Sequence, residues 1–514
     1  MTANPWGLRT SYQITLFTCR SLIWQECNFM RIRPLRYFLL VLSFLILGSA
    51  RAEAQFVPGK LFVVNDTADS FDANPGDRIC ADSNGRCTLR AAIQEVDAVT
   101  VVLDDVIIFS IPQPSEINLT LGELAVTGRR FVSIVGPGAR RLTVRRSGAP
   151  GTPNFRIFNL SGGQSIHEIR GLTIANGDPG TEPDGGAIKL GPGTNLTLTE
   201  VTITGNAAIN GGGVSNMGTL DITRSLFSAN SAAGQGGAIR NAQGATMRVW
   251  NTTITGSSAL MGGALYNEGA LTLANDTISH NMAATAASGI FSGSTGTISI
   301  INTIVGASGA SAITNLSGPF NSFGNNLITD ARNSTGFTAG AMGDQVSNND
   351  AIDARLGPLA DNGGQTNTRA LLSGSPAIDK GNGCVLNGQC NLPQTFPPRQ
   401  PLRLTSDQRR LYSRFSLTFE GFGGRIDIGA FEAGASQGTS GGAFGVFTVD
   451  GRAGRLVGTA SLTDVVTGER VYATINPFGS LRFQRLAGSG IYIFQFNTKR
   501  NPQSGPQVFD LAPF

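Results

Sequence analysis

The chain contains four near-copies of one short segment: GGAIKL (185–190), GGGVSN (211–216), GGAIRN (236–241) and GGALYN (262–267). The small residue after each glycine pair recurs every 25 or 26 residues, and two apolar columns recur every 24 or 27 residues. The three columns are Ala187, Gly213, Ala238, Ala264 and Gly289; Leu198, Ile222, Val249, Leu273 and Ile300; and Ile203, Phe227, Ile254 and Ile278. Self-similarity at such a period indicates a solenoid in which each repeat forms one coil.

Each repeat also contains a stretch in which apolar and polar residues alternate: LTLTEVTI (196–203), LDITRSLF (220–227), MRVWNTTI (247–254) and LTLANDTI (271–278). Alternation with a period of two indicates β-strands with one buried face. No ten-residue stretch of the repeats has helical spacing, which excludes helical repeats. We therefore predict an all-β chain built on a right-handed parallel β-helix, with three short strands in each coil.

The glycines and asparagines of the repeat have a structural explanation in this fold. A coil that turns sharply needs a positive φ angle or a close backbone approach, and glycine permits both. The residues Asn216, Asn241 and Asn267 are expected to adopt left-handed turn geometry or to form a ladder of amides between coils. We assign Asn206, Asn230 and Asn281 to another corner.

The N-terminal region has the pattern of a secretory signal. Three arginines precede an apolar run at 37–47, and an A-x-A pattern ending at Ala54 follows it. We predict a signal peptide at 30–54, with residues 1–29 a misassigned upstream extension. The protein is then expected to be exported to the extracellular space or the outer-membrane surface of a bacterium. The apolar run itself is too short to span a bilayer comfortably. The mature chain, from which this run is removed, is expected to have no membrane-spanning segment.

The mature chain carries balanced charge. Removing the six arginines and two glutamates of residues 1–54 from the 39 basic and 35 acidic residues leaves 33 of each. This balance argues against nucleic acid as a partner, since a basic surface carries that affinity. Four cysteines remain, and an oxidising compartment predicts the disulfides Cys80–Cys87 and Cys384–Cys390. A metal site is the alternative, but the chain has only two histidines, so we predict neither a metal nor a cofactor.

Several motifs resemble known families of secreted bacterial proteins. The GGAI words, paired with FSAN (227–230), resemble the repeats of polymorphic outer membrane proteins. The segment CTLRAAIQEVD (87–97) resembles the Cys-Ser-Leu-Arg-Glu-Ala (CSLREA) motif region, which implies an N-terminal cap over about 80–97. Three segments resemble the choice-of-anchor Q domain: LGPLADNGGQTNTRALLSGSPAIDKGN (356–382), DQR (407–409) and RIDIGAFE (425–432). That resemblance implies a right-handed, pectin-lyase-like β-helix over 55–432, with the choice-of-anchor Q region at about 356–432.

The chain departs from that family after Glu432. A glycine- and serine-rich linker, AGASQGTSGG (433–442), leads to residues 443–514, which resemble the carboxypeptidase regulatory-like β-sandwich. Several short alternating strands separated by turns support a sandwich there. Such domains serve as stalks or adhesion modules, and the family name implies no peptidase activity.

The candidate catalytic residues are carboxylates on one loop. The stretch NGDPGTEPDGG (176–186) carries Asp178, Glu182 and Asp184, which could serve a polysaccharide lyase or glycoside hydrolase. Calcium would be needed only in that case. A solvated turn is the alternative explanation, and the repeats offer no stacked carboxylates elsewhere.

A second candidate surface is a column of outward residues. Lys189, Ser215, Arg240 and Tyr266 each follow the small residue by two positions and should stack on one face. Of these, Lys189, Arg240 and Tyr266 could grip an acidic polysaccharide by charge and ring stacking. An ordinary solvent-exposed face is the alternative. We predict a non-catalytic structural, adhesive or glycan-contacting role, with a polysaccharide or a host or neighbouring cell surface as partner.

Overall fold

The computed structural model describes residues 59–99, 104–128, 130–306, 313–393, 404, 406–410 and 426–433, and the backbone of six strands between 446 and 511. The predicted upstream extension, the signal peptide and nearly all of the predicted linker lie outside the described residues. No helix within the described ranges is long and apolar enough to cross a membrane.

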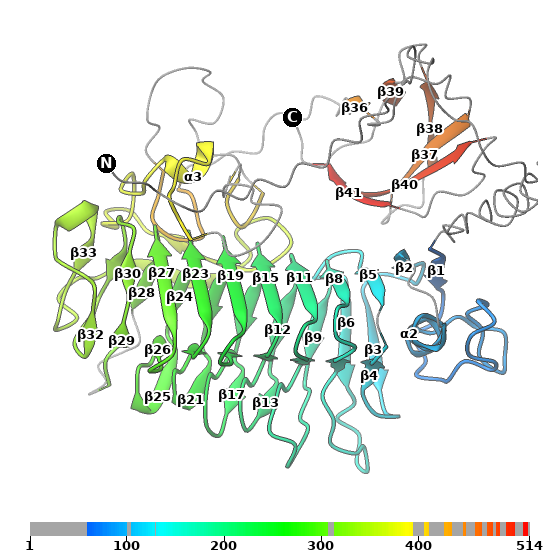
Figure 1. Cartoon of the computed structure of the whole chain (residues 1–514), viewed down its shortest axis with the longest axis horizontal. Coiled ribbons are helices and arrows are strands. Elements are labelled where there is room, and N and C mark those ends of the chain that lie inside the picture. The colour runs from blue at the N-terminus through cyan, green and yellow to red at the C-terminus, as the bar shows by residue number, and fades with distance from the viewer. Residues whose placement is uncertain are drawn as a thin grey trace, which may run out of the picture. The chain divides into compact units, whose positions relative to one another are not determined.

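Three long parallel sheets form the body of the fold (Figure 1). The first sheet contains β1 (Leu61–Val64), β2 (Asp104–Phe109), β5 (Phe131–Val135), β8 (Ile166–Arg170), β11 (Asn195–Thr199), β15 (Thr219–Thr223), β19 (Thr246–Trp250), β23 (Ala270–Ala274), β27 (Thr297–Ile301) and β30 (Asn321–Ser322). The second contains β4 (Leu124–Val126), β7 (Phe158–Leu160), β10 (Ile188–Leu190), β14 (Val214–Asn216), β18 (Ile239–Asn241), β22 (Leu265–Asn267), β26 (Ile290–Ser292), β29 (Leu316–Pro319) and β32 (Ser334–Thr335).

The third sheet completes each coil, and a smaller fourth sheet adds a fourth strand to four of the coils, for which three strands were predicted. The third contains β3 (Ser115–Leu119), β6 (Leu142–Arg146), β9 (Thr173–Ala175), β12 (Thr202–Thr204), β16 (Leu226–Ser228), β20 (Thr253–Thr255), β24 (Thr277–Ser279), β28 (Ile304–Gly306), β31 (Leu327–Ile328) and β33 (Gln345–Val346). The fourth contains β13 (Ala207–Ala208), β17 (Ser231–Ala232), β21 (Ser258–Met261) and β25 (Met282–Ala286). Successive strands in each sheet come from successive coils and run parallel, so the predicted parallel β-helix is confirmed.

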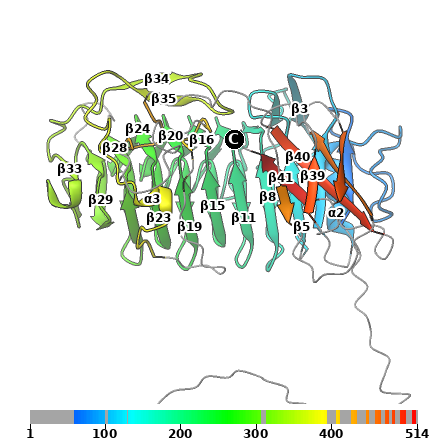
Figure 2. The ribbon, with the colours of Figure 1, turned by 90° about the horizontal axis from the view of Figure 1, so that it is seen from above.

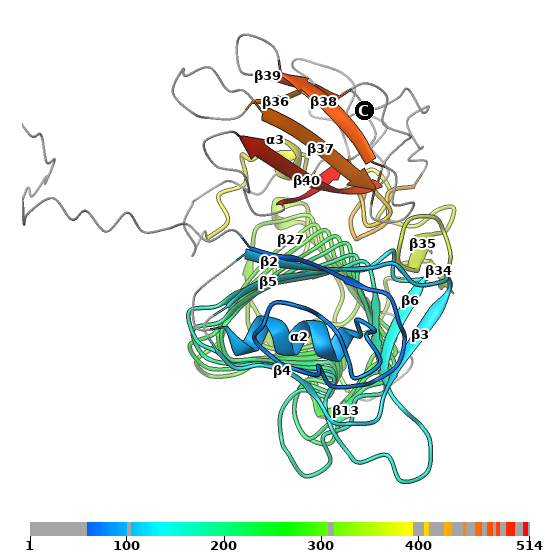
Figure 3. The same cartoon turned by 90° about the vertical axis from the view of Figure 1, so that its right-hand side faces the viewer.

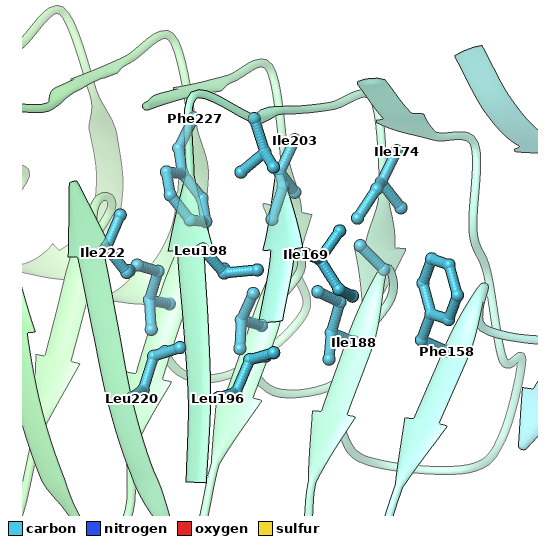
Figure 4. Close-up of a cluster of buried hydrophobic side chains, with 14 of the residues drawn as sticks. Phe158, Ile169, Ile174, Ile188, Leu196, Leu198, Ile203, Leu220, Ile222 and Phe227 are labelled. Carbon is cyan, nitrogen blue, oxygen red and sulfur yellow. The ribbon is translucent and has the colours of Figure 1, made fainter. Parts of the chain in front are cut away.

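The predicted apolar columns stack in register inside the coils. Leu198 pairs with Ile222 in the first sheet, and Ile203 pairs with Phe227 in the third. Figure 4 shows these side chains pointing into one shared interior. All four are at most 1% exposed, and burying each such side chain contributes about 1.5–3 kcal/mol. The core is therefore one continuous apolar column along the solenoid.

The glycine pairs have the positive φ angle and the close backbone approach that the repeat predicts. The first glycine of each pair has a positive φ, for example 70° at Gly185 and 67° at Gly236. At the second, a Cβ atom on Gly186 or Gly237 would overlap backbone carbonyl oxygens of the next coil. The first glycine is therefore required by its φ angle, and the second by the close approach of the next coil.

The left-handed geometry predicted for Asn216, Asn241 and Asn267 is wrong, whereas the amide ladder is confirmed. These three residues end strands of the second sheet, and Asn216 Nδ2 donates to Asn241 Oδ1 at 2.7 Å, as Asn241 does to Asn267. The left-handed corner is another column, formed by Glu200, Arg224, Asn251, Asn275 and Asn302. At the corner of Asn206, its Nδ2 donates to Asn230 Oδ1 at 3.0 Å.

A polar ladder also runs beside the third sheet. The backbone N–H of Thr252 donates to Asp276 Oδ1 at 2.9 Å, and the backbone N–H of Asp276 faces Thr303 Oγ1 at 3.4 Å. The hydroxyls of Thr252 and Thr303 also donate to carbonyl oxygens two residues earlier in the chain. Asp276 is fully buried, and burial raises the pKa of its carboxyl well above the ordinary value.

The N-terminal end of the solenoid is covered by a helix. Helix α2 (Leu89–Ala98) lies across the coil cross-section, as Figure 3 shows, and buries Leu89, Ile93 and Val96 in the core. The Thr88 hydroxyl caps it by accepting the Ala91 N–H at 3.1 Å. Both predicted disulfides are present, Cys80–Cys87 before this helix and Cys384–Cys390 around the short helix α3 (Cys384–Asn387). A single 3₁₀ turn, η1, spans Ala341–Gly343.

The described residues of the segment 356–433, here called the strap, pack along the outside of the coils. The strap begins with an antiparallel hairpin of β34 (Leu356–Ala360) and β35 (Thr368–Leu371), which Figure 2 shows beside β16, β20 and β24. Arg369 Nε donates to Thr255 Oγ1 at 3.0 Å. These contacts hold the hairpin against strands more than 100 residues earlier in the chain.

The later part of the strap is held by polar contacts. Gln408 Oε1 accepts from Thr253 Oγ1 at 2.6 Å, and its Nε2 donates to the Ser225 carbonyl at 3.0 Å. Arg410 forms an ion pair with the buried carboxylate of Glu200. Burial opposes ionisation of Glu200, but the hydrogen bond and charge of Arg410 hold its pKa below the ordinary value.

The C-terminal strands form one six-stranded antiparallel sheet. Its members are β36 (Val446–Thr448), β37 (Gly458–Asp464), β38 (Arg470–Ile475), β39 (Ser480–Phe483), β40 (Gly490–Thr498) and β41 (Gln507–Leu511). The prediction of a packed sandwich there depends on side chains that lie outside the described residues.

Candidate functional site

The three carboxylates predicted for catalysis lie on one loop but have different partners. Asp178 accepts the Gly180 N–H of its own turn at 3.0 Å. The Glu182 side chain is 68% exposed and 4.0 Å from Arg156. Asp184 accepts from the Ser215 hydroxyl at 3.1 Å and lies 3.7 Å from Arg240. This arrangement matches the alternative of a solvated turn better than a paired acid and base.

The predicted glycan-contact column stacks in register, from Lys189 through Ser215 and Arg240 to Tyr266. Its predicted solvent exposure is wrong for two members. Ser215 is fully buried and Tyr266 is only 6% exposed. Lys189 keeps partial exposure.

The Tyr266 and Arg240 side chains contact neighbours on the same face. The Tyr266 ring stacks on Phe291 with centroids 5.1 Å apart, and its hydroxyl faces Glu268 at 3.3 Å. Burial and the charge of Glu268 raise the pKa of Tyr266. Arg240 lies 3.7 Å from Asp184 and 3.8 Å from Glu268. The Tyr266 ring is therefore covered, whereas the Arg240 side chain remains 20% exposed and Lys189 keeps partial exposure.

A groove of about 530 Å³ lies on the outer face of the first sheet. Strands β2, β5, β8 and β11 form its floor, and their alternation sends every second side chain outward. The outward residues that line it are Asp104, Val106, Phe131, Ser133, Ile166, Glu168 and Thr197. Its volume falls within the range of small-molecule sites, about 300–1,000 Å³.

The groove combines apolar and polar groups suited to a sugar. Phe131 and Ile166 pair across β5 and β8, and Ile166 is 51% exposed. On the next outward row, the Ser133 hydroxyl faces Glu168 at 3.5 Å, and Glu168 lies 3.4 Å from Arg170. An apolar platform beside hydroxyl and carboxylate groups can hold the C–H face of a sugar ring and bind its hydroxyls.

The two outward carboxylates of the groove have different surroundings. Burial, together with the charge of the neighbouring Asp105, raises the pKa of Asp104. Asp105 itself points inward and is bound by the Arg78 guanidinium at 2.6 and 2.8 Å. Asp105 is therefore compensated within the protein, whereas Asp104 and Glu168 face the groove.

One polar residue beneath the groove points into the core. His167 lies between Val132 and Leu196 in the inward column, and it is 1% exposed. Neither ring nitrogen has a hydrogen-bond partner within the described part of the chain. Burial lowers its pKa to about 4, so the ring is neutral at pH 7. Its place in the core suits a structural role.

The groove could not be predicted from the repeat because the early coils are irregular in length. Phe131, Ile166 and Asn195 are adjacent in the first sheet but are separated by 35 and 29 residues in the chain. The signal was nevertheless present, since FVSIV (131–135) and IHEIR (166–170) fill the same register as NLTLT (195–199). Aligning these pentapeptides would have placed Glu168 beside Thr197.

Within the described ranges, no group of three or more His, Cys, Asp or Glu side chains could hold a metal ion. No protein-family model matches the sequence, and no curated protein matches it. A solved structure titled as that of pectate lyase Pel9A aligns with 74% of this chain and 98% of its own at 13% identity. Its TM-score of 0.26 is too low to support any argument about this chain.

Proposed function

We propose that this protein is an exported bacterial surface protein that contacts polysaccharide without cleaving it. Its right-handed β-helix would form a long rigid body, and the groove on the first sheet would be its contact surface. The observation that carries the proposal is the lining of this groove, where Phe131 and Ile166 form an apolar platform beside Ser133 and Glu168. Two local disulfides agree with an exported protein.

The family resemblances add detail to this proposal. The choice-of-anchor Q and CSLREA motifs favour surface display, and a carboxypeptidase regulatory-like domain after 443 would serve as a stalk or adhesion module. A neighbouring cell surface or a shed polysaccharide would then be the partner.

A glycan array probed with the exported chain tests the proposal. We expect binding to at least one polysaccharide, and an exposed-site variant, Ile166→Ser, should weaken that binding severalfold because it removes part of the platform. A matched control is Leu260→Ser, since Leu260 is 41% exposed on β21 and lies outside the groove. Absence of binding, or equal effects of both variants, would overturn the proposal.

A glycoside hydrolase is the second candidate, and one observation favours it. Asp104, whose pKa is raised, lines the groove, as a general acid would. A lyase is less well supported, since no lysine or arginine is among the described lining residues to act as its base. Incubation with a panel of polysaccharides, with and without Ca²⁺, would reveal products if either enzyme activity exists.

A further inference from the structure

The charge of the groove narrows the class of glycan it can accept. This step rests on the proposed function and concerns the same site. The described residues that line the groove include the outward carboxylates Asp104 and Glu168 and no lysine or arginine. The third carboxylate, Asp105, is neutralised from inside by Arg78. The surface that a ligand would meet is therefore apolar, with the Asp104 carboxylate on one side and the Glu168 carboxylate, which is ion-paired with Arg170, on the other.

The two carboxylates stand at opposite corners of the groove. Asp104 aligns with Phe131 and Ile166 across three strands, and Glu168 lies two residues further along β8. With strands ~4.8 Å apart and a rise of ~3.3 Å per residue, their Cα atoms are ~12 Å apart. Phe131, Ser133 and Ile166 fill the space between them. One ring would rest on the platform while neighbouring sugars approach each carboxylate.

Glu168 is held in place from the protein side. Arg170, which is 4% exposed on the same strand, lies 3.4 Å from its carboxylate, and the Ser133 hydroxyl approaches from β5. This contact orders the carboxylate before a ligand arrives, which reduces the entropy lost on binding. Because Arg170 is buried, it offers no open cationic surface to an acidic ligand.

We infer that the groove selects a polysaccharide carrying free amino groups, such as a glucosamine polymer, over neutral and uronic-acid polymers. An ammonium group would form charge-assisted hydrogen bonds with Asp104 or Glu168, which are stronger than those of neutral sugars. A uronate would place a like charge against both residues, which disfavours binding. The inference is opposite to the expectation from Lys189 and Arg240, whose column pointed to an acidic polysaccharide.

Three oligosaccharides of equal length test this selectivity in isothermal titration calorimetry with the exported chain. They are oligomers of glucosamine, of N-acetylglucosamine and of galacturonic acid. The first two differ mainly at nitrogen, so their difference reports the charge. We expect the glucosamine oligomer to bind about tenfold tighter or more, as a hydrogen bond between charged groups allows. The preference should shrink as salt rises from 20 to 300 mM, since partly exposed charges are screened.

A charge-neutral variant locates the effect. Glu168→Gln should reduce the preference for glucosamine over N-acetylglucosamine severalfold, because the variant keeps the shape of the side chain and removes its charge. The matched control is Glu116→Gln on β3, because the Glu116 carboxylate is 52% exposed and lies outside the groove. Asp104→Asn provides a second test at the other corner if Glu168→Gln fails to fold, as judged by circular dichroism.

The outcomes separate the two proposals. If none of these oligomers and no polysaccharide on the array binds, the proposed function itself fails. If glycans bind but the neutral or uronic-acid oligomer binds as well as glucosamine, the charge selectivity is wrong and the contact surface stands. If the preference survives in the double variant Glu168→Gln/Asp104→Asn, the amino group is recognised elsewhere and the inference is overturned.

Discussion

Replacing His167 with leucine should both stabilise the protein and remove part of its acid sensitivity. His167 occupies a position between Val132 and Leu196 in the core, where its two ring nitrogens have no partner in the described structure. Leucine matches its neighbours in the column and introduces no polar atom. The variant therefore separates the cost of a buried imidazole from that of the surrounding packing.

The pH dependence follows from the difference between the folded and unfolded states. In the unfolded chain the His167 ring has an ordinary pKa of 6.5, and burial lowers its pKa to about 4 in the fold. Between these values the unfolded state binds a proton that the folded state does not, so stability is lost as pH falls from 6.5 to 4. Each pH unit costs about 1.4 kcal/mol, so the loss at pH 4.5 approaches ~2.5 kcal/mol.

Urea unfolding at pH 7.5 and pH 4.5, followed by circular dichroism, measures this effect. Carboxylates also titrate in this window, so the quantity of interest is the difference between wild type and His167→Leu at each pH. That difference should grow by ~2.5 kcal/mol from pH 7.5 to pH 4.5. His280→Asn is the control: burial and the charge of Arg369 also lower the pKa of His280, but the residue is exposed, so it should change the slope less than His167 does. An unchanged difference between the two pH values would refute the account of His167.

Two further changes probe the ladders. Asp276→Thr should raise the free energy of unfolding at pH 7 by about 1–3 kcal/mol, because threonine keeps the ladder contact without a buried carboxyl. Since the pKa of Asp276 is raised in the fold, this increase in the free energy of unfolding should shrink as pH falls toward 3.8. Urea titrations at pH 7 and pH 4 measure it, and an increase that is absent or equal at both pH values would contradict the prediction. Asn241→Ala should lower the free energy of unfolding by about 1–3 kcal/mol in the same assay, because Asn216 and Asn267 both lose their hydrogen-bond partner. An unchanged free energy of unfolding would contradict a stabilising role of the amide ladder.

The regular coils could be predicted from sequence because their physics is local. Strand alternation identifies the inward face, and a fixed period aligns one coil with the next. The φ of 70° at Gly185 and the steric limit at Gly186 both follow from a chain that must turn within two residues. For the same reason the disulfides, which close loops of a few residues, were predictable.

The features that could not be predicted depend on contacts between residues far apart in sequence, or on neighbouring side chains that the alternation of apolar and polar residues does not reveal. Alternation assigned Tyr266 to the outer face correctly, yet the stacking of Phe291 beside it removed its exposure. The ion pair of Glu200 with Arg410 joins residues 210 positions apart. The groove residues lie in coils whose loops vary in length, so no fixed period marks them.

The strap makes the number of coils a fixed quantity. A free solenoid could gain or lose whole coils by duplication or deletion, because every added coil offers the same surface to the next. Here points of the strap meet different coils: Arg410 binds Glu200, Gln408 binds Thr253, and the Ala430 N–H donates to Thr277 Oγ1. An extra coil inserted between Glu200 and Thr277 would shift these partners apart by ~4.8 Å, the spacing of neighbouring strands. The strap therefore acts as a molecular ruler, and the fold can lengthen in evolution only outside the span that it measures.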